Sequence, residues 1–305
     1  MSQVLTLNAI VERNKRTDLI IASIGIAILL IAMSLLVSVF IDLLHSGWPR
    51  LFDASFYTNF PSRHPERAGI LSAWVGTSLV MLVTAAIAIP FGVAAGLYLE
   101  EYAPKNWLTN IIEINVSNLA GVPSIIYGLL ALGLFIYGFG LGESILTAGL
   151  VLALLILPVI IVATRESIRS IPQELREAAY GLGADQWQTV RLYVLPAARP
   201  GILTGTIVGL ARAIGEAAPV ITIGALTFIA FLPESPFQAE PPFINFDWLS
   251  SPFTLMPIQL FNWVSRPQAD FHINAAATGV VLMAMTILMN GIAIYIRYRL
   301  RRNLK

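Results

Sequence analysis

The run from Ser144 to Thr164, SILTAGLVLALLILPVIIVAT, decides the fold class of this chain. It contains no Asp, Glu, Lys, Arg or His, and its length matches the roughly 20 residues of helix that cross the hydrocarbon layer of a bilayer. Because hydrocarbon offers the backbone no hydrogen-bond partner, such a run must satisfy every N–H and C=O within a helix. The run therefore predicts a transmembrane helix.

Five further apolar runs lie on either side of it, and the whole chain is 56% hydrophobic and only 12% charged. Soluble domains are roughly 45–50% apolar and about 25% charged. The expected fold class is therefore an all-α integral membrane protein with six transmembrane helices. We expect a tail over residues 1–18, a transmembrane domain over 19–298 and a basic tail over 299–305. The five runs are Leu19–Ile41, Ala68–Leu99, Ile114–Gly142, Pro200–Pro233 and Ile273–Ile296.

The distribution of Lys and Arg predicts the orientation of these spans. With six spans both termini lie on one side, and fourteen Lys and Arg side chains then fall on that side against four on the other. Positive charge is retained in the cytoplasm during insertion, so both termini are predicted to be cytoplasmic in a bacterial plasma membrane.

Few residues offer catalytic or ligand-binding chemistry. Cysteine is absent, and the three histidines are scattered without metal-ligand spacing. No lysine belongs to a GxxxxGK[ST] loop, so a partner would have to bind any ATP and Mg²⁺ that is used. We expect no catalytic residues, no metal and no cofactor in this chain. A net charge of +1 also indicates no nucleic-acid partner.

The loop from Ser170 to Pro196, between the fourth and fifth spans, predicts a helical hairpin. Ser170 followed by Gln173 is typical of a capping box, with Pro172 in the first turn. Gly183 suits the left-handed position that ends this helix. Asp185 followed by Gln188 predicts a second short helix, which Pro196 closes. Ala178 and Ala179 are expected on the surface, where small side chains would allow close docking. Local physics alone equally allows a simple connecting hairpin.

The same loop resembles the EAA motif of ABC-importer permeases. The matching residues are Glu177, Ala178, Ala179, Gly183, Leu195 and Pro196. The resemblance implies the ABC type I importer (MetI-like) architecture. It also implies that the hairpin sits in a groove of the ATP-binding cassette and transmits its closure to the pore.

Other segments resemble phosphate-importer permeases of the PstA type. They are Asn118–Ser124, Arg212–Pro219 and Asn262–Gln268, together with Pro61–Thr77. The resemblance implies inorganic phosphate as substrate. Besides membrane lipid, the implied partners are a homologous PstC-type permease, a cassette ATPase dimer and an external phosphate-binding protein.

Arg212, Glu216 and Ser124 are the candidate residues of the substrate pathway. Arg212 lies within an apolar run, where an arginine is costly and usually faces a cavity, and its planar donors suit phosphate oxygens. Glu216 lies one turn later and could neutralise Arg212, so a purely structural ion pair is the alternative. Gly121 and Pro123 can loosen the third span so that freed N–H groups or a helix N-terminus face an anion, and Ser124 could add a hydroxyl donor. An ordinary proline kink also fits.

Two further features bear on packing and charge. Small residues recur every four positions in the fifth span, at Gly201, Gly205, Gly209, Ala213 and Ala217, and predict close contact with a neighbouring helix. Glu100 and Glu101 could contact a partner or the basic tails, or be solvated. We assign Glu113 no substrate role.

Two alternative functions stay open. One is a permease for another tetrahedral oxyanion, such as sulfate or molybdate. The other is a gated anion channel in which Arg212 and Glu216 form the filter.

Single cysteines test the orientation, because the native chain has none. We expect an impermeant thiol reagent to label His64→Cys and Pro241→Cys in intact cells, and to leave Asn14→Cys and Asn303→Cys unlabelled, because the positive flanks hold the termini inside. Labelling at position 14 or 303 without labelling at 64 would reverse the topology.

Overall fold

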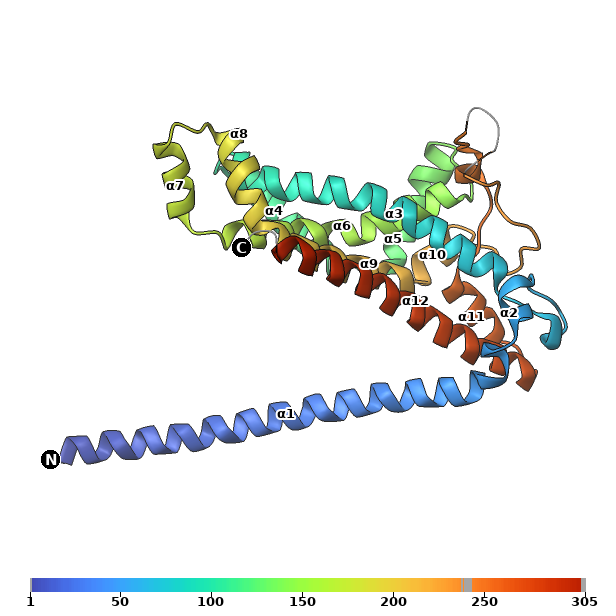
Figure 1. The fold of residues 1–305 in the computed structure, drawn as a ribbon, viewed down its shortest axis with the longest axis horizontal. Helices are drawn as coiled ribbons and strands as arrows, with labels where there is room; N and C mark the ends of the chain where they lie inside the picture. Colours follow the sequence, from blue (N-terminus) through green and yellow to red (C-terminus); the bar gives the residue numbers. More distant parts are fainter. Residues whose placement is uncertain (1, 237, 239–242, 303–305) are drawn as a thin grey trace.

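The computed structural model describes residues 2–236, 238 and 243–302, and the regular elements within them are helices (Figure 1). The positions of Pro241 and Asn303 lie outside the described residues. Five helices are long and apolar enough to cross a membrane, and a bent helix pair brings the number to six. The expectation of an all-helical chain with six spans is therefore confirmed.

Helix α6 (Ile145–Arg169) lies at the centre of the bundle. It contains the apolar run Ser144–Thr164 except for Ser144, which is its N-cap residue. It packs between α3 (Leu71–Leu97) and α9 (Leu195–Gly215). Glycines on both neighbours face it: Gly92 lies against Ile160, and Gly96 against Thr164. The predicted ridge of small residues on α9 also contacts α6, since Gly201 faces Ser167 and Gly205 faces Ala163. Small residues thus let the three backbones approach closely, as in other membrane bundles.

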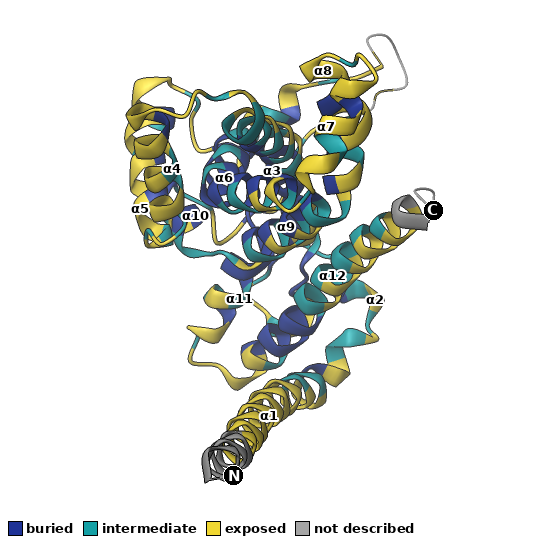
Figure 2. Cartoon of the chain, turned by 90° about the vertical axis from the view of Figure 1, so that its left-hand side faces the viewer, coloured by how far each residue is buried: buried dark blue, intermediate teal, exposed yellow. Residues whose placement is uncertain are grey.

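Helices α1 (Ser2–Leu51) and α12 (Ala269–Arg302) join this core from one side. They meet only near one end, where Gly47 lies against the backbone of Ala277. Arg50 fixes this corner, since its Nε donates to Asn274 Oδ1 at 3.0 Å and its Nη2 to Ala68 O at 2.6 Å. From this corner α1 diverges from the bundle (Figure 1), and its apolar side chains between Leu19 and Ile41 are exposed (Figure 2). The free ends of both helices point toward the end of the bundle that carries α7 (Gln173–Gly181) and α8 (Gln186–Thr189), which we call the hairpin end (Figure 1).

At the opposite end, short elements cover the bundle. They are α2 (Ala54–Thr58), a turn of 3-10 helix at Pro65–Arg67, another at Asp247–Ser250, and α11 (Met256–Val264). Trp263 and Phe56 are fully buried in this layer. It therefore has a packed apolar core of its own.

The third span is not a straight helix. Helix α4 (Trp107–Leu119) and helix α5 (Ser124–Ala131), with the wide π-turn Leu132–Gly138 that continues it, are bent by 108°. The break contains Gly121 and Pro123, as the loosened helix ladder predicted. Pro123 disfavours a helical conformation in the residue before it and has no N–H to donate, and α5 begins directly after it with Pro123 as the N-cap residue.

The bounds predicted for the fifth span are wrong at both ends. The helix extends from Gln186 to Gly215, and Pro196 does not close it. The π-turn Val190–Val194 precedes Pro196, which lies in the first turn of α9, where its missing N–H costs little. Beyond Gly215 the chain leaves the helix and forms only the short α10 (Ala218–Thr222).

A β-branched residue at Gly205 should separate α6 from α9. A Cβ at Gly205 would overlap the Cβ of Ala163, and overpacking of this kind costs about 1–3 kcal/mol. We therefore expect Gly205→Val to lower the thermal unfolding temperature of the detergent-solubilised protein. Gly291→Val on α12 is the matched control, since no atom lies within 4 Å of the corresponding Cβ. Equal stability of the two variants would show that the α6–α9 contact tolerates separation.

Candidate functional site

The predicted capping box at the start of the hairpin, Ser170 with Gln173, is not formed. Ser170 does not cap α7, because its backbone N–H donates to Glu166 O at 3.0 Å and its hydroxyl to Ser167 O at 2.8 Å. Both groups are thus used to close α6. Pro172 is the N-cap residue of α7, outside the first turn, and makes no side-chain cap.

The turn of the hairpin confirms its prediction. Gly183 has φ +85°, the left-handed conformation. Its N–H donates to Tyr180 O at 2.9 Å, and the N–H of Ala184 donates to Ala179 O at 3.1 Å, so that a Schellman motif ends α7. Asp185 then caps α8 in a reciprocal capping box with Gln188, with hydrogen bonds of 2.7 and 3.0 Å. The turn is therefore rigid on both sides of Gly183.

The hairpin exposes an apolar surface outside the bundle. Leu182 is 83% exposed, and Trp187 and Tyr180 are also exposed. Glu177 and Ala178 lie on the surface, as expected, but Ala179 is buried against the hairpin itself, and the expectation for it was wrong. Exposed aromatic and aliphatic side chains on a segment outside the transmembrane helices are typical of a protein-binding surface.

Leu195 and Pro196, the last two residues of the motif, lie in the first turn of α9. Leu195 packs against the small apolar cluster of Ile168, Val194, Ala198 and Ile202. The end of the motif is therefore part of the bundle, whereas its beginning projects from it.

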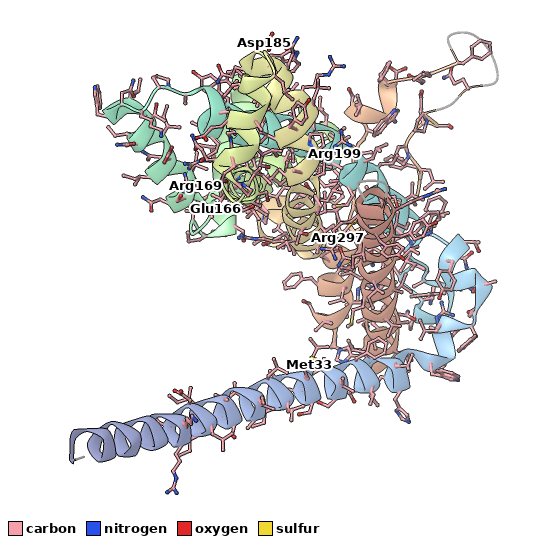
Figure 3. The ribbon with its side chains drawn as sticks, turned by 60° about the vertical axis from the view of Figure 1, so that its left-hand side comes forward. Met33, Glu166, Arg169, Asp185, Arg199 and Arg297 are labelled. Atoms are coloured by element: carbon pink, nitrogen blue, oxygen red, sulfur yellow. The ribbon has the colours of Figure 1, made fainter. Side chains whose placement is uncertain are left out.

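Ion pairs tie the hairpin and the end of α6 to the other helices. Arg176 on α7 donates to Glu101 at 2.7 Å and to Ile171 O at 2.8 Å. Arg169 forms two hydrogen bonds to Glu100, of 3.0 and 2.9 Å (Figure 3 shows Arg169 beside Glu166). Two parallel hydrogen bonds between a guanidinium and a carboxylate fix the relative orientation of the two side chains in addition to pairing their charges.

Arg165 extends this network into the bundle. Its side chain is only 8% exposed and lies 2.8 Å from Glu113 on α4 and 3.5 Å from Glu100. Sequence reasoning left Glu100 and Glu101 open and gave Glu113 no role, and it did not single out the arginines. The sequence did contain a signal for this network, because Glu100, Glu101 and Glu113 lie on the same predicted face of the membrane as the arginines. Their pairing could not be read from it.

Near the middle of the bundle, α9 ends. Gly209 lies against Ile156 and Ile160, at the midpoint of α6, and Arg212 follows within one turn. Arg212 Nε lies 3.4 Å from Glu216 Oε1, and the side chains are 36% and 21% exposed. The backbone of Glu216 and Ala217 is non-helical here. At membrane depth such backbone is tolerated only where protein buries it or where it lines a watery cavity.

The second broken helix lies close to this point. Helix α10 packs on α5, where Gly128 lies against Thr222 and the backbone of Pro219. Ser124 is the half-buried first residue of α5. Tyr127 donates a hydrogen bond to Leu119 O at 2.7 Å and thereby bridges the bend. Within the described residues, Arg212 and Glu216 contact each other, and Ser124 contacts neither. The structure thus brings two of the three predicted pathway residues together.

Gly183→Val tests the hairpin turn. No atom lies within 4 Å of a Cβ at Gly183 or at Gly181, so both sites have space, but only Gly183 has a positive φ. A left-handed backbone costs an L-residue about 1–2 kcal/mol. We expect Gly183→Val to insert normally but to lose, in co-purification from mild detergent, the cassette ATPase that the EAA resemblance implies, whereas Gly181→Val retains it. Full retention by Gly183→Val would show that the turn is not needed for docking.

The chain was compared with known proteins. The family model of the "binding-protein-dependent transport system inner membrane component" matches residues 88–304. The probable ABC transporter permease protein YqgH of Bacillus subtilis (strain 168) is 35% identical over 225 residues, covering 70% of this chain and 72% of YqgH. The phosphate transport system permease protein PstA 1 of Mycobacterium tuberculosis (strain ATCC 25618 / H37Rv) is 31% identical over 236 residues, covering 77% and 72%.

Among solved structures, the inward-facing MetNI methionine ABC transporter matches with a TM-score of 0.58 at 18% identity. The match covers 76% of this chain and 95% of that one, which confirms the MetI-like fold. Since the family model matches more than half of the chain and the bundle has the fold of a solved importer permease, this protein belongs to the family of binding-protein-dependent transport system inner membrane components, the permease subunits of ABC importers.

Proposed function

We propose that this chain is the PstA-type permease of an ATP-driven phosphate importer and forms half of its translocation pathway. The names of several relatives support phosphate, among them the PstA proteins of Mycobacterium tuberculosis and Yersinia pestis. A homologous PstC-type permease supplies the other half of the pathway. An external phosphate-binding protein delivers the ion, and a cassette ATPase dimer binds ATP and Mg²⁺. The chain itself catalyses no reaction.

One observation carries the mechanism: a single continuous helix joins the hairpin to the ion pair. It extends from Gln186 to Gly215, 30 residues, and Arg212 lies in its last turn. At 1.5 Å per residue such a helix is about 45 Å long. A displacement of the hairpin by the closing cassettes would therefore move Arg212 directly. No flexible loop lies between them.

The geometry at Arg212 suits a transient anion contact. Arg212 contacts Glu216 through Nε alone, which lies 3.4 Å from Glu216 Oε1. Within the described residues, the two Nη nitrogens of Arg212 have no hydrogen-bond partner. A guanidinium can grip phosphate oxygens with two parallel donors, which an ammonium cannot do. Glu216 balances the charge when no anion is bound, and Ser124 at the start of α5 is the proposed hydroxyl donor.

We place the hairpin end in the cytoplasm of a bacterial cell and the α2–α11 layer outside. The positive charge count supports this orientation, and the ion pairs of Arg165, Arg169 and Arg176 lie at the hairpin end. Both α1 and α12 point their free ends toward the hairpin end, which supports the proposal that this side of the membrane carries both termini (Figure 1). The cassette dimer then meets the exposed surface of Tyr180, Leu182 and Trp187.

A set of charge variants tests the role of Arg212. A single neutral variant is ambiguous because it strands the partner charge, so Arg212→Gln is compared with Glu216→Gln and with the double variant. We expect the double variant to assemble with its partners but not to take up phosphate in proteoliposomes. We expect Arg212→Lys to be impaired, because an ammonium lacks the planar pair of donors.

Assembly is measured in each case by co-purification of the cassette ATPase and the second permease. Thr206→Val, on the same helix but buried, is a control for general damage to α9. Normal ATP-driven uptake of phosphate by the assembled double variant would show that the ion pair is structural. ATP-independent flux through the wild-type complex would instead indicate a gated channel.

A further inference from the structure

A cavity of about 420 Å³ lies between α9 and α12 on the side toward the hairpin. It is separate from the ion pair of Arg212 and from the exposed hairpin surface. Its lining comes from two helices and consists of Pro200, Gly201, Thr204, Ile294, Arg297 and Tyr298.

The depth of this cavity follows from the packing of α9 on α6. Gly201 faces Ser167 and Gly205 faces Ala163, so the cavity lies level with the last two turns of α6. Those turns carry Arg165 and Arg169, where the apolar part of the bundle ends. The cavity is therefore at the boundary between hydrocarbon and the headgroup layer.

The polar wall of the cavity carries a positive charge that no carboxylate among the described residues balances. Arg297 Nη1 donates to Thr204 Oγ1 at 2.8 Å, and the Thr204 hydroxyl in turn donates to Pro200 O at 2.8 Å (Figure 3 shows Arg297). Within the described residues Arg297 forms no salt bridge, in contrast to Arg165, Arg169 and Arg176. A neutral hydroxyl thus orients the guanidinium without neutralising it.

The other walls are apolar and continue into the exposed surface of the two helices. Ile294 is 47% exposed and Val208, one turn beyond Thr204, is 56% exposed. Tyr298 is exposed beside the arginine, and tyrosine favours the interface because its ring is apolar and its hydroxyl polar. A cationic group above an apolar groove at this depth matches a molecule with an anionic head and a hydrocarbon tail.

We infer that this cavity binds an anionic phospholipid, with the phosphodiester on Arg297 and an acyl chain along the groove between α9 and α12. Basic pockets between transmembrane helices on one face of the membrane bind such headgroups. A free phosphate ion would use the arginine but leave the groove unfilled. A helix of the second permease is the other possible occupant of the groove, and it would exclude the lipid.

The site has a consequence for transport because α9 is continuous with the hairpin. A lipid held between α9 and α12 contacts the helix that joins α8 to Arg212. We expect ATP-driven uptake to increase with the anionic lipid content of the membrane. Lipid binding itself does not depend on which ion is carried, so it can be tested even if the proposed substrate is wrong.

The test uses the assembled transporter in nanodiscs of phosphatidylcholine, with or without phosphatidylglycerol. Native mass spectrometry counts the lipids that remain bound, and the thermal unfolding temperature is measured in parallel. We expect wild type to retain phosphatidylglycerol and to unfold at a higher temperature with it. Arg297→Gln should bind it about fivefold more weakly, the factor that one basic side chain contributes at an anionic surface.

Arg299→Gln is the matched control, since Arg299 lies two residues further along α12, is exposed and does not line the cavity. It should retain the lipid as wild type does. Equal retention by Arg297→Gln and Arg299→Gln would overturn the site. So would stabilisation by inorganic phosphate in pure phosphatidylcholine that equals the effect of phosphatidylglycerol, or the absence of any retained anionic lipid, which would indicate that the second permease covers the groove.

Discussion

The close contact of α6 with α3 and α9 is the constraint on which the rest of the structure depends. A side chain at Gly92 or Gly96 on α3, or at Gly201 or Gly205 on α9, would collide with α6. Within hydrocarbon, apolar surface alone does not draw helices together, so van der Waals packing of such small surfaces has to supply the association. The contact also fixes the depth of every other feature, because α6 spans the bundle from end to end.

Helix α9 packs on α6 along one face only and is continuous with α8, so it can move as one rigid unit. Its ridge of glycines contacts α6, while Thr204, Val208 and Arg212 face away from that contact. At the hairpin end, the Schellman turn and the capping box make the hairpin stiff, and Arg176 binds it to Glu101. A force applied to the hairpin is then shared between α9 and the charge network that reaches α4 through Arg165 and Glu113.

Two helices break where α9 ends, and both breaks have a local cause. Gly121 and Pro123 lie in the break between α4 and α5, and Pro219 lies in the first turn of α10, just after the break that ends α9. Short helices α5 and α10 then pack on each other, so the polar groups freed at the breaks lie within one part of the bundle. Transporters of other folds also use discontinuous helices to offer polar groups at mid-membrane. Here the arrangement supports the proposal that Arg212 is tolerated at this depth and meets an anion.

The sequence by itself determined the features that depend on neighbours in the chain. Six apolar segments follow from hydropathy, and Gly183 and Asp185 follow from turn and capping chemistry, since each forms its bonds within five residues. The loosened ladder at Gly121 and Pro123 was likewise predictable. Tertiary structure alone decided which groups meet. Ala179 is buried and not exposed. Two predictions of helix ends were wrong although the contacts are local: Ser170 closes α6 and does not open α7, and the helix continues through Pro196 after a π-turn. Glu100, Glu101 and Glu113 find their arginines only when three helix ends converge. The physical reason is that the partner of a side chain across the bundle depends on how the helices pack, and the spacing of residues in the sequence does not specify that packing.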